Sequence, residues 1–182
     1  MKTAFRLFLL AALVALGVWL WFVLFPGPEK IIRQRLTKLA RTASFSAGEG
    51  NLAKLAAAED IAGYFATNAE INIEVPGRAQ HTLAGRAEIR QVALGARERL
   101  SGLNVQFPDI NITVAPGKQS AVADLTVVVR VAGEPDSIVQ EMKFTFQKTD
   151  DGWLIARVET VRTLTSVTLR FALHCAPFIV ST

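Results

Sequence analysis

The longest uninterrupted apolar run in the sequence lies close to its start. Residues 7–25 contain no charged side chain, and at about 1.5 Å per residue such a helix spans close to the roughly 30 Å hydrocarbon core of a bilayer. Trp19 and Trp21 lie near its end, where aromatic rings commonly sit at the headgroup level, and Pro26 would stop the helix. The pattern predicts a transmembrane anchor, and we assign residues 1–27 to a short N-terminus and this helix.

A cleaved signal peptide is the alternative for this segment. Signal peptides usually have an apolar stretch of about 7 to 15 residues that ends at small side chains. Here the exit Leu24-Phe25-Pro26 carries bulky residues instead, so an uncleaved anchor is favoured. The chain is therefore expected to be a single-pass membrane protein. The side on which the rest of the chain lies stays undecided, because basic residues flank the segment at both ends.

Three later segments have the apolar spacing that is typical of amphipathic helices. Residues 30–43 place isoleucine and leucine side chains on one side and basic side chains on the other. A second helix is expected over residues 52–65, with Asn51 as its N-cap. A third is expected over residues 86–100, after a glycine.

Alternating apolar and polar positions indicate strands in the rest of the chain. Residues 70–75 alternate in this way, and a Pro-Gly turn leads into a short strand over 79–83. Four longer strands are separated by short turns rich in Gly, Pro and Asp, at 103–115, 120–132, 137–148 and 152–163. This order predicts an α+β domain, in which a strongly bent antiparallel sheet wraps around about three helices to form a cone with a mouth.

Three motifs in this order resemble a known superfamily. They are Asp60-Ile61-Ala62-Gly63-Tyr64-Phe65-Ala66-Thr67-Asn68-Ala69-Glu70-Ile71, Gly85-Arg86-Ala87-Glu88-Ile89 and Asp150-Asp151-Gly152-Trp153-Leu154-Ile155. Together they resemble the nuclear transport factor 2-like superfamily, SnoaL-like branch. The resemblance implies the cone-shaped fold, and we assign residues 28–163 to this domain. Isomerases, dehydratases, polyketide cyclases, transport factors and secretion components share the fold, so it implies no single activity.

The distribution of charge separates the anchor region from the domain. The chain has 20 Lys and Arg against 16 Asp and Glu, and the positive excess lies within residues 1–41, while the remainder is slightly acidic. Cations beside a membrane segment are attracted to anionic headgroups. We therefore expect contact with the membrane surface through four side chains, Lys30, Arg33, Lys38 and Arg41. The domain lacks a basic face interleaved with aromatic residues, so nucleic-acid binding is not expected.

Few sequence patterns point to a particular chemistry. The two histidines, His81 and His174, are far apart, and no His-x-x-x-His or Cys-x-x-Cys occurs, so no metal site is predicted. The single cysteine cannot form an intramolecular disulfide. No glycine-rich phosphate loop or Gly-x-Ser-x-Gly motif is present, and no cofactor is predicted. The chemistry that these absences leave open is general acid-base catalysis by a side chain in a partly dry pocket.

Three residues are candidates for such chemistry. His81 would face the cone cavity if Ala79, His81 and Leu83 share the inward face of their strand. Tyr64 and Asp60 form an i, i+4 pair on the expected second helix, where isomerases of the superfamily also keep an important tyrosine. The alternative for Tyr64 is a packed ring with a solvated hydroxyl.

Ligand contacts are also expected from the long strands and the last turn. Asp124 lies among apolar residues. An unpartnered carboxylate that points inward would cost several kcal/mol, so Asp124 either faces solvent or has a functional role in a pocket. Phe144 occupies an apolar position of its strand, and Trp153 lies near the last turn. These three positions, Asp124, Phe144 and Trp153, are the predicted pocket contacts.

Three hypotheses for the function follow. The first is a membrane-tethered module for binding or assembly, which takes a small apolar ligand or forms a homodimer through the sheet face. The second is an isomerase, dehydratase or cyclase that uses the cone pocket. The third is a subunit of a bacterial envelope or secretion complex, because an anchor helix followed by this cone resembles the inner-membrane assembly subunit of type IV secretion systems. The tail, residues 164–182, could add an edge strand, dock on the cone or mediate a dimer.

Overall fold

The computed structural model of the protein describes residues 27–73 and 81–161, with residue 81 described by its backbone alone. The helices are α2 (Pro28–Ala43), α3 (Asn51–Ala62) and α4 (Arg86–Arg99). The strands are β1 (Phe65–Ile73), β2 (His81–Ala84), β3 (Leu103–Gln106), β4 (Ile110–Val114), β5 (Ser120–Val131), β6 (Ser137–Thr149) and β7 (Gly152–Thr160). The anchor expected at 7–25 and the tail at 164–182 lie outside the described residues. Within the described ranges, no helix has the length and apolar composition that a membrane span requires.

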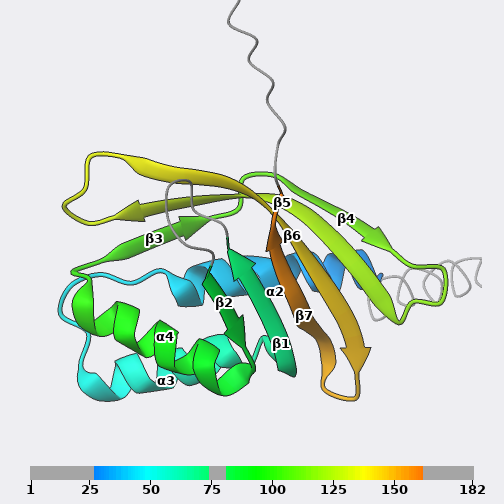
Figure 1. Ribbon diagram of the computed structural model, residues 1–182, viewed down its shortest axis with the longest axis horizontal. Coiled ribbons are helices and arrows are strands. Elements are labelled where there is room, and N and C mark those ends of the chain that lie inside the picture. The colour runs from blue at the N-terminus through cyan, green and yellow to red at the C-terminus, as the bar shows by residue number, and fades with distance from the viewer. Residues whose placement is uncertain (1–26, 74–80, 162–182) are drawn as a thin grey trace, which may run out of the picture.

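The strands form one curled sheet that wraps around the helices (Figure 1). Its order is β2-β1-β7-β6-β5-β3, and β4 also pairs with β5. The predicted α+β cone is confirmed, but an entirely antiparallel sheet is wrong, because β1 and β7 pair in parallel. Parallel neighbours need a long crossover connection, and here α4 and the strands β2 to β6 provide it.

Helix α2 forms close to where its apolar spacing predicts it. Gly27 is the N-cap and Pro28 occupies the first turn, where a missing backbone N–H leaves no hydrogen bond unmade. Glu29 in the first turn and Arg41 in the last turn suit the helix dipole. Four side chains of one face are buried, namely Ile32, Leu36, Leu39 and Ala40. Because this face packs into the core, the opposite face of α2 is exposed to solvent.

The second predicted helix is shorter than its sequence pattern suggests. Helix α3 ends at Ala62, and the segment from Phe65 onward is strand β1. The backbone N–H of Ile155 donates to the Tyr64 carbonyl, so pairing with β7 begins directly after the helix. The N-cap is Gly50 and not the predicted Asn51, and no side chain caps this end.

The edge of the sheet beside β5 consists of two short strands and not of one long strand. The single strand predicted at 103–115 is two strands, because Phe107, Pro108 and Asp109 separate β3 from β4. Proline has no N–H to donate to a ladder. Both strands pair with β5, β4 with its first half and β3 with its second half. The long strand β5 therefore carries two short neighbours that follow its curvature.

The core lies on the inner face of this curled sheet. Strand β6 alternates in burial, so that Met142, Phe144 and Phe146 face inward while Lys143 is exposed. The side chains of Ile32 and Leu36 from α2 join this core and are completely buried. At the other end of the fold α3 and α4 lie side by side (Figure 1). Between them and the sheet the packing leaves a space, which is the candidate site.

Candidate ligand cavity

The inside of the cone contains a cavity of about 270 Å³. All three helices and most of the strands contribute to its wall, and its aromatic side chains are Phe45, Phe65, Phe107 and Phe144. The rings of Phe107 and Phe144 meet edge to face, with their centroids 6.2 Å apart. Among the described lining residues, every side chain except Arg97 is apolar. Such a wall favours a ligand with a largely apolar surface.

Helix α4 supplies one side of the cavity through small residues. Ile89, Ala93 and Ala96 follow one another at helical spacing, and all three line the cavity. The helix is fixed to the sheet by Arg86, whose Nε and Nη2 donate to the Phe65 carbonyl at 3.0 and 2.6 Å. Because α4 is held in place and its alanines are short, the space in front of them stays open.

Arg97 is the one charged residue that is buried in the described part of the chain, with 3% of its surface exposed. Its Nη1 donates to Glu49 Oε2 at 2.5 Å, and its Nη2 donates to the Thr42 carbonyl. The guanidinium also lies over the ring of Phe45, 4.8 Å from the centroid. Its Nε has no acceptor among the described residues. Arg97 therefore belongs to the cavity wall, while its guanidinium nitrogens are buried and one of them, Nε, lacks an acceptor among the described residues.

The structure places the three predicted pocket contacts at different sites, and only one of them lines the cavity. Phe144 lines the cavity. Trp153 is buried, with 4% of its surface exposed, but it does not belong to the cavity wall. Asp124 is exposed on the outer face of β5, where it lies opposite Lys143 of β6 and Asn111 of β4. Only Phe144 of this set is placed to contact a ligand inside the cone.

The predicted acid-base candidates do not gather at this cavity. Tyr64 lies in the turn after α3 and not on the helix, and it shares with Asp60 a separate, more polar groove beside α2. The guanidinium of Arg35 lies over the Tyr64 ring there, 5.8 Å from the centroid. The backbone of His81 pairs with that of Ile73 in the β1-β2 ladder. The role of His81 stays a prediction, because its side chain is not described.

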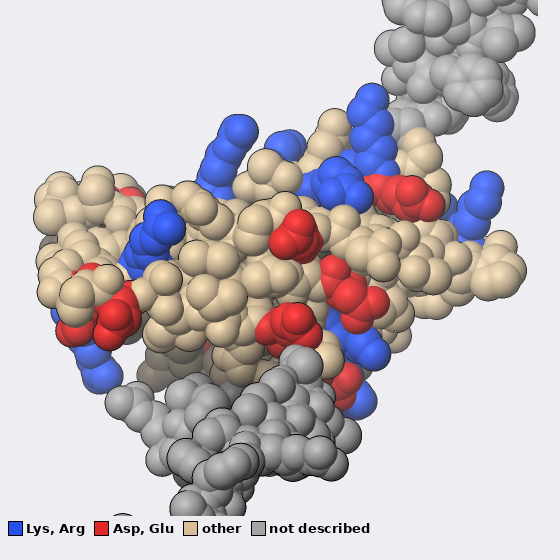
Figure 2. Space-filling view, turned by 90° about the horizontal axis from the view of Figure 1, so that it is seen from above, with Lys and Arg blue, Asp and Glu red and all other residues tan. Residues whose placement is uncertain are grey.

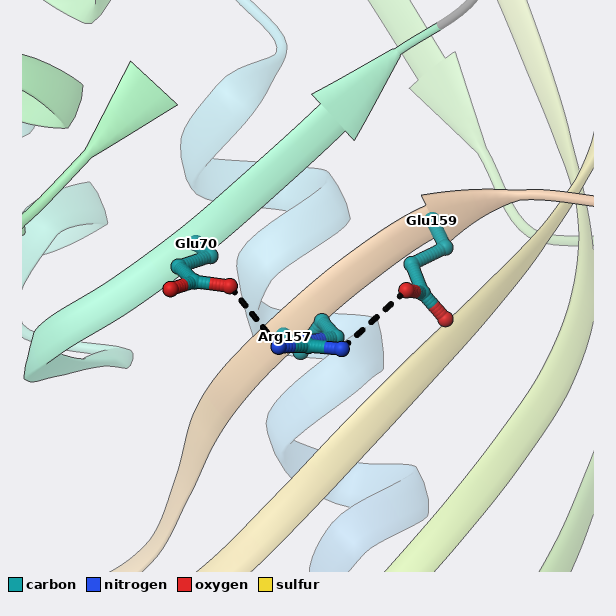
Figure 3. Close-up of polar contacts among 3 residues, drawn as sticks. All are labelled: Glu70, Arg157 and Glu159. Carbon is teal, nitrogen blue, oxygen red and sulfur yellow. Dashed lines mark hydrogen bonds and ion pairs between the residues drawn. The ribbon is translucent and has the colours of Figure 1, made fainter. Parts of the chain in front are cut away.

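On the outer face of the sheet, Arg157 forms one ion pair with a neighbouring strand and one along its own strand. Arg157 of β7 donates to Glu70 of β1 at 2.8 Å and to Glu159 at 3.4 Å, and all three are substantially exposed (Figure 3). Acidic and basic side chains are interspersed over the face seen in Figure 2. Exposed pairs of this kind contribute little to stability but make the face strongly hydrated.

The four predicted membrane-surface residues all lie on the outward side of α2. Lys30, Lys38 and Arg41 are exposed, and so is Arg33, which donates from Nη2 to the Ile110 carbonyl at 3.0 Å. The pattern of burial on α2 thus leaves a basic surface facing away from the core. In residues 27–73 and 81–161, no three potential metal ligands of the His, Cys, Asp or Glu type lie close enough together to hold an ion.

Sequence reasoning missed Arg97, although its position carried a signal. The apolar stripe of the third predicted helix runs through Ile89 and Ala93, and the next position along it is Arg97. A charge inside an apolar stripe is unusual, because burial of an unpaired charge is costly. Its partner Glu49 lies in the segment between the first two helices, where no local pattern marks it.

Solved structures of other proteins have a fold similar to that of this chain. The chain is similar in structure to a nuclear transport factor 2-like protein with a cystatin-like fold from Novosphingobium aromaticivorans, with 22% identity over 85% of this chain and 92% of the other, and a TM-score of 0.59. It is also similar to a proposed scytalone dehydratase from the same organism (16% identity, 75% and 84% covered, TM-score 0.55). A third similar structure belongs to the yeast complex of the deubiquitinase Ubp3 with its cofactor Bre5 (12% identity, 75% and 98% covered, TM-score 0.54).

At these identities the similar structures show the fold alone. No curated protein matches the chain. The SnoaL-like domain family, however, matches residues 48–159, which is more than half of the sequence and contains α3, α4, the strands β1 to β6 and all of β7 except its last residue. The chain therefore belongs to the SnoaL-like domain family.

Proposed function

We propose that this protein is a membrane-anchored module that binds a small apolar ligand inside its cone. The observation that carries the proposal is the cavity of about 270 Å³, because its described wall is apolar apart from Arg97. Cavities of this kind stay dry and accept apolar guests, whereas a wall with several polar groups would hold water. A preformed apolar pocket in a small domain is the first place to expect a binding site.

The size of the cavity limits the ligand. A cavity of about 150 Å³ lined by Leu, Ile and Phe binds benzene, which corresponds to about 25 Å³ for each heavy atom. On this scale, the 270 Å³ of the cone accommodates about ten or eleven heavy atoms. We therefore expect a ligand with the bulk of two fused rings, which is smaller than a steroid.

Acid-base catalysis is the second candidate function and has weaker support. It needs a proton-transferring side chain at the cavity, and the described wall contains no carboxylate, histidine, tyrosine or cysteine. Tyr64 and Asp60 lie in the separate groove beside α2. An isomerase, dehydratase or cyclase activity would use His81 as its proton-transferring group, and the similarity to the proposed scytalone dehydratase from Novosphingobium aromaticivorans favours this alternative.

The membrane attachment is part of the same proposal. Residues 7–25 would span the bilayer, and the outward basic side chains of α2, which begins at Pro28, would lie near anionic headgroups. A tether of this kind would keep the cone close to apolar molecules dissolved in the bilayer. Assembly remains an alternative, either in an envelope or secretion complex or as a homodimer through the sheet face.

The binding proposal can be tested with naphthalene as the probe. The chain contains two methionines, Met1 and Met142, and Met142 lines the cavity, so a sample labelled at the methionine methyl groups has one signal that reports on the site. Full-length protein in lipid nanodiscs is titrated with naphthalene while this signal is recorded by NMR. We expect a saturable shift of the Met142 signal.

Two leucine variants of α4 serve as the matched pair. Ala93→Leu adds three heavy atoms inside the cavity and removes about 75 Å³, which leaves too little space for naphthalene. Ala87→Leu adds the same atoms on the exposed side of the helix. We expect the titration to persist in Ala87→Leu and to weaken at least tenfold in Ala93→Leu. An unchanged titration in Ala93→Leu, or no shift of Met142 in the unmodified protein, would contradict the proposal.

A further inference from the structure

A second site lies outside the cone, in the polar groove beside α2 that contains Tyr64 and Asp60. One wall is a stripe of α2 at helical spacing, and the other is the end of α3 with the turn that follows it. Apart from Ile31, every side chain that lines the groove is polar or charged, so the groove suits a polar ligand. Its volume is about 510 Å³, and it is lined by Ile31, Gln34, Arg35, Lys38, Asp60, Gly63 and Tyr64.

Arg35 is held in this groove from one side. Its guanidinium lies over the Tyr64 ring, 5.8 Å from the centroid, and its Nη1 donates to the Asp151 carbonyl at 3.4 Å. Gly152 lies against the same nitrogen, because a Cβ on this glycine would be 3.0 Å from Nη1. The other two nitrogens, Nε and Nη2, have no acceptor among the described residues, and neither of them is buried. A guanidinium held in this way is preorganised to donate to the oxygens of an anion.

The groove carries charges of both signs that do not pair with each other. Arg35 and Lys38 are cations on α2, while Asp60 is an anion near the end of α3. Within the described residues, no ion pair joins Asp60 to either cation. A simple anion would be attracted by one wall and repelled by the other. A zwitterion that presents its anion to α2 and its cation to α3 is complementary to both walls.

From this arrangement we infer that the groove binds the phosphoethanolamine headgroup of a membrane lipid. The phosphate accepts from Arg35 and Lys38, and the primary ammonium donates to the Asp60 carboxylate. A choline headgroup has no N–H to donate and a glycerol headgroup has no positive charge, so both make a weaker contact with Asp60. At about 25 Å³ for each heavy atom, the headgroup with its glycerol carbons occupies roughly 300 Å³, which the groove accommodates.

The lipid as the source of this headgroup rests on the membrane attachment in the proposed function. The groove begins at Ile31, a few residues after the predicted anchor at 7–25, and a tether of that length keeps it beside the bilayer surface. The affinity for phosphoethanolamine does not depend on the attachment, because the groove consists of described residues alone. It does not depend on the cavity inside the cone either, which is lined by a different set of residues.

Tyr64 makes the inference testable by NMR. It is the only tyrosine of the chain, so a sample labelled at the tyrosine ring has one signal, and this signal comes from the groove. Full-length protein in phosphatidylcholine nanodiscs is titrated with glycerophosphoethanolamine, and in a second arm phosphatidylethanolamine replaces phosphatidylcholine stepwise in the nanodisc. We expect a saturable shift of the Tyr64 signal in both arms. Glycerophosphocholine should bind about fivefold more weakly, as the loss of one partly exposed ion pair predicts.

Three variants assign the recognition to the two walls. Asp60→Asn removes the anion near the end of α3, where a negative charge is unfavourable to the helix dipole, so the variant should fold, and we expect it to bind both esters equally. Glu59→Gln is the matched control, because it neutralises the neighbouring acid, which pairs with Arg90 outside the groove, and it should keep the fivefold preference. Arg35→Gln should weaken both esters about tenfold, because it removes the guanidinium that holds the phosphate.

The outcomes separate the inference from the proposed function. If glycerophosphoethanolamine leaves the Tyr64 signal unchanged, the inference fails, whether or not naphthalene shifts the Met142 signal of the cavity. A preference for ethanolamine over choline that persists in Asp60→Asn would also overturn it. A shift with the soluble ester but none with phosphatidylethanolamine would overturn the lipid source and assign a soluble phosphoethanolamine ester to the groove. Loss of the protein from the nanodiscs would refute the membrane attachment, and with it the lipid source.

Discussion

Removing the partner of the buried arginine is expected to destabilise the domain strongly. In Glu49→Ala, the guanidinium of Arg97 keeps the Thr42 carbonyl and the Phe45 ring but loses the ion pair with Glu49, its only one among the described residues. Removing one member of a buried pair costs about 3 to 5 kcal/mol, because the other charge is left without compensation. The side chain of Glu49 is 27% exposed while that of Arg97 is 2% exposed, so water replaces part of the lost interaction.

The expected loss is therefore at the lower end of that range, about 3 kcal/mol. It is a substantial share of the 5 to 15 kcal/mol that typically separates folded from unfolded domains. For a domain of this size it corresponds to a fall in melting temperature of about 10 °C. The magnitude follows from the burial of the arginine and not from the length of the hydrogen bond.

Urea unfolding of residues 27–182 measures this loss. Of the three tryptophans of the chain, this fragment keeps only Trp153, which is buried and whose fluorescence therefore reports unfolding. Glu70→Ala is the matched control, because it removes a glutamate that pairs with Arg157 at 2.8 Å while both side chains are about half exposed. We expect less than about 1 kcal/mol for this control.

The double variant Glu49→Ala with Arg97→Met completes the comparison. It removes the uncompensated charge, so it is expected to regain most of the stability that Glu49→Ala loses. The reasoning is refuted if Glu49→Ala costs no more than Glu70→Ala, since the pair would then behave as an exposed one. It is also refuted if the double variant is less stable than Glu49→Ala alone.

Two further predictions concern the backbone and the basic surface of α2. Gly85 has φ +85° and ψ 155°, a region that is essentially restricted to glycine, so Gly85→Ala should cost about 1 to 3 kcal/mol in urea unfolding. Gly95→Ala, inside α4 with open space around the new methyl group, should instead stabilise by about 0.5 to 1 kcal/mol. Changing Lys30, Lys38 and Arg41 together to Gln should lower the partitioning of residues 27–182 onto anionic vesicles, by about 1 kcal/mol for each cation in a sedimentation assay, with neutral vesicles as the control.

The regular elements were predictable because local patterns determine them. Helix α2 and strands β5 to β7 begin and end close to the expected residues, since their alternation or helical spacing is undisturbed by long-range contacts. The errors lie where contacts with distant segments determine the secondary structure. Phe65 leaves the helical pattern because β7 pairs with it, and the predicted strand at 103–115 breaks at Pro108, which cannot complete a ladder.

The site was less predictable than the fold. The inward position of Phe144 was predictable because inward positions of a strand follow a period of two, while its contact with a ligand stays a prediction. Arg97 meets Glu49 across 48 positions of the sequence, a pairing that no local pattern contains. The parallel contact of β1 with β7 is of the same kind, because strand order depends on the whole chain.

The place of β7 in the sheet has a consequence for how the protein is made. This strand is the last of the seven to be synthesised, yet it lies between β1 and β6 and forms part of the cavity wall through Val158. Chains grow at about 5 to 20 residues per second, so the edge of β1 that pairs with β7 lacks its neighbour for several seconds after β1 is made. The emerging chain therefore has an unpaired strand edge at β1, and the cavity wall is complete only when synthesis has passed Thr160.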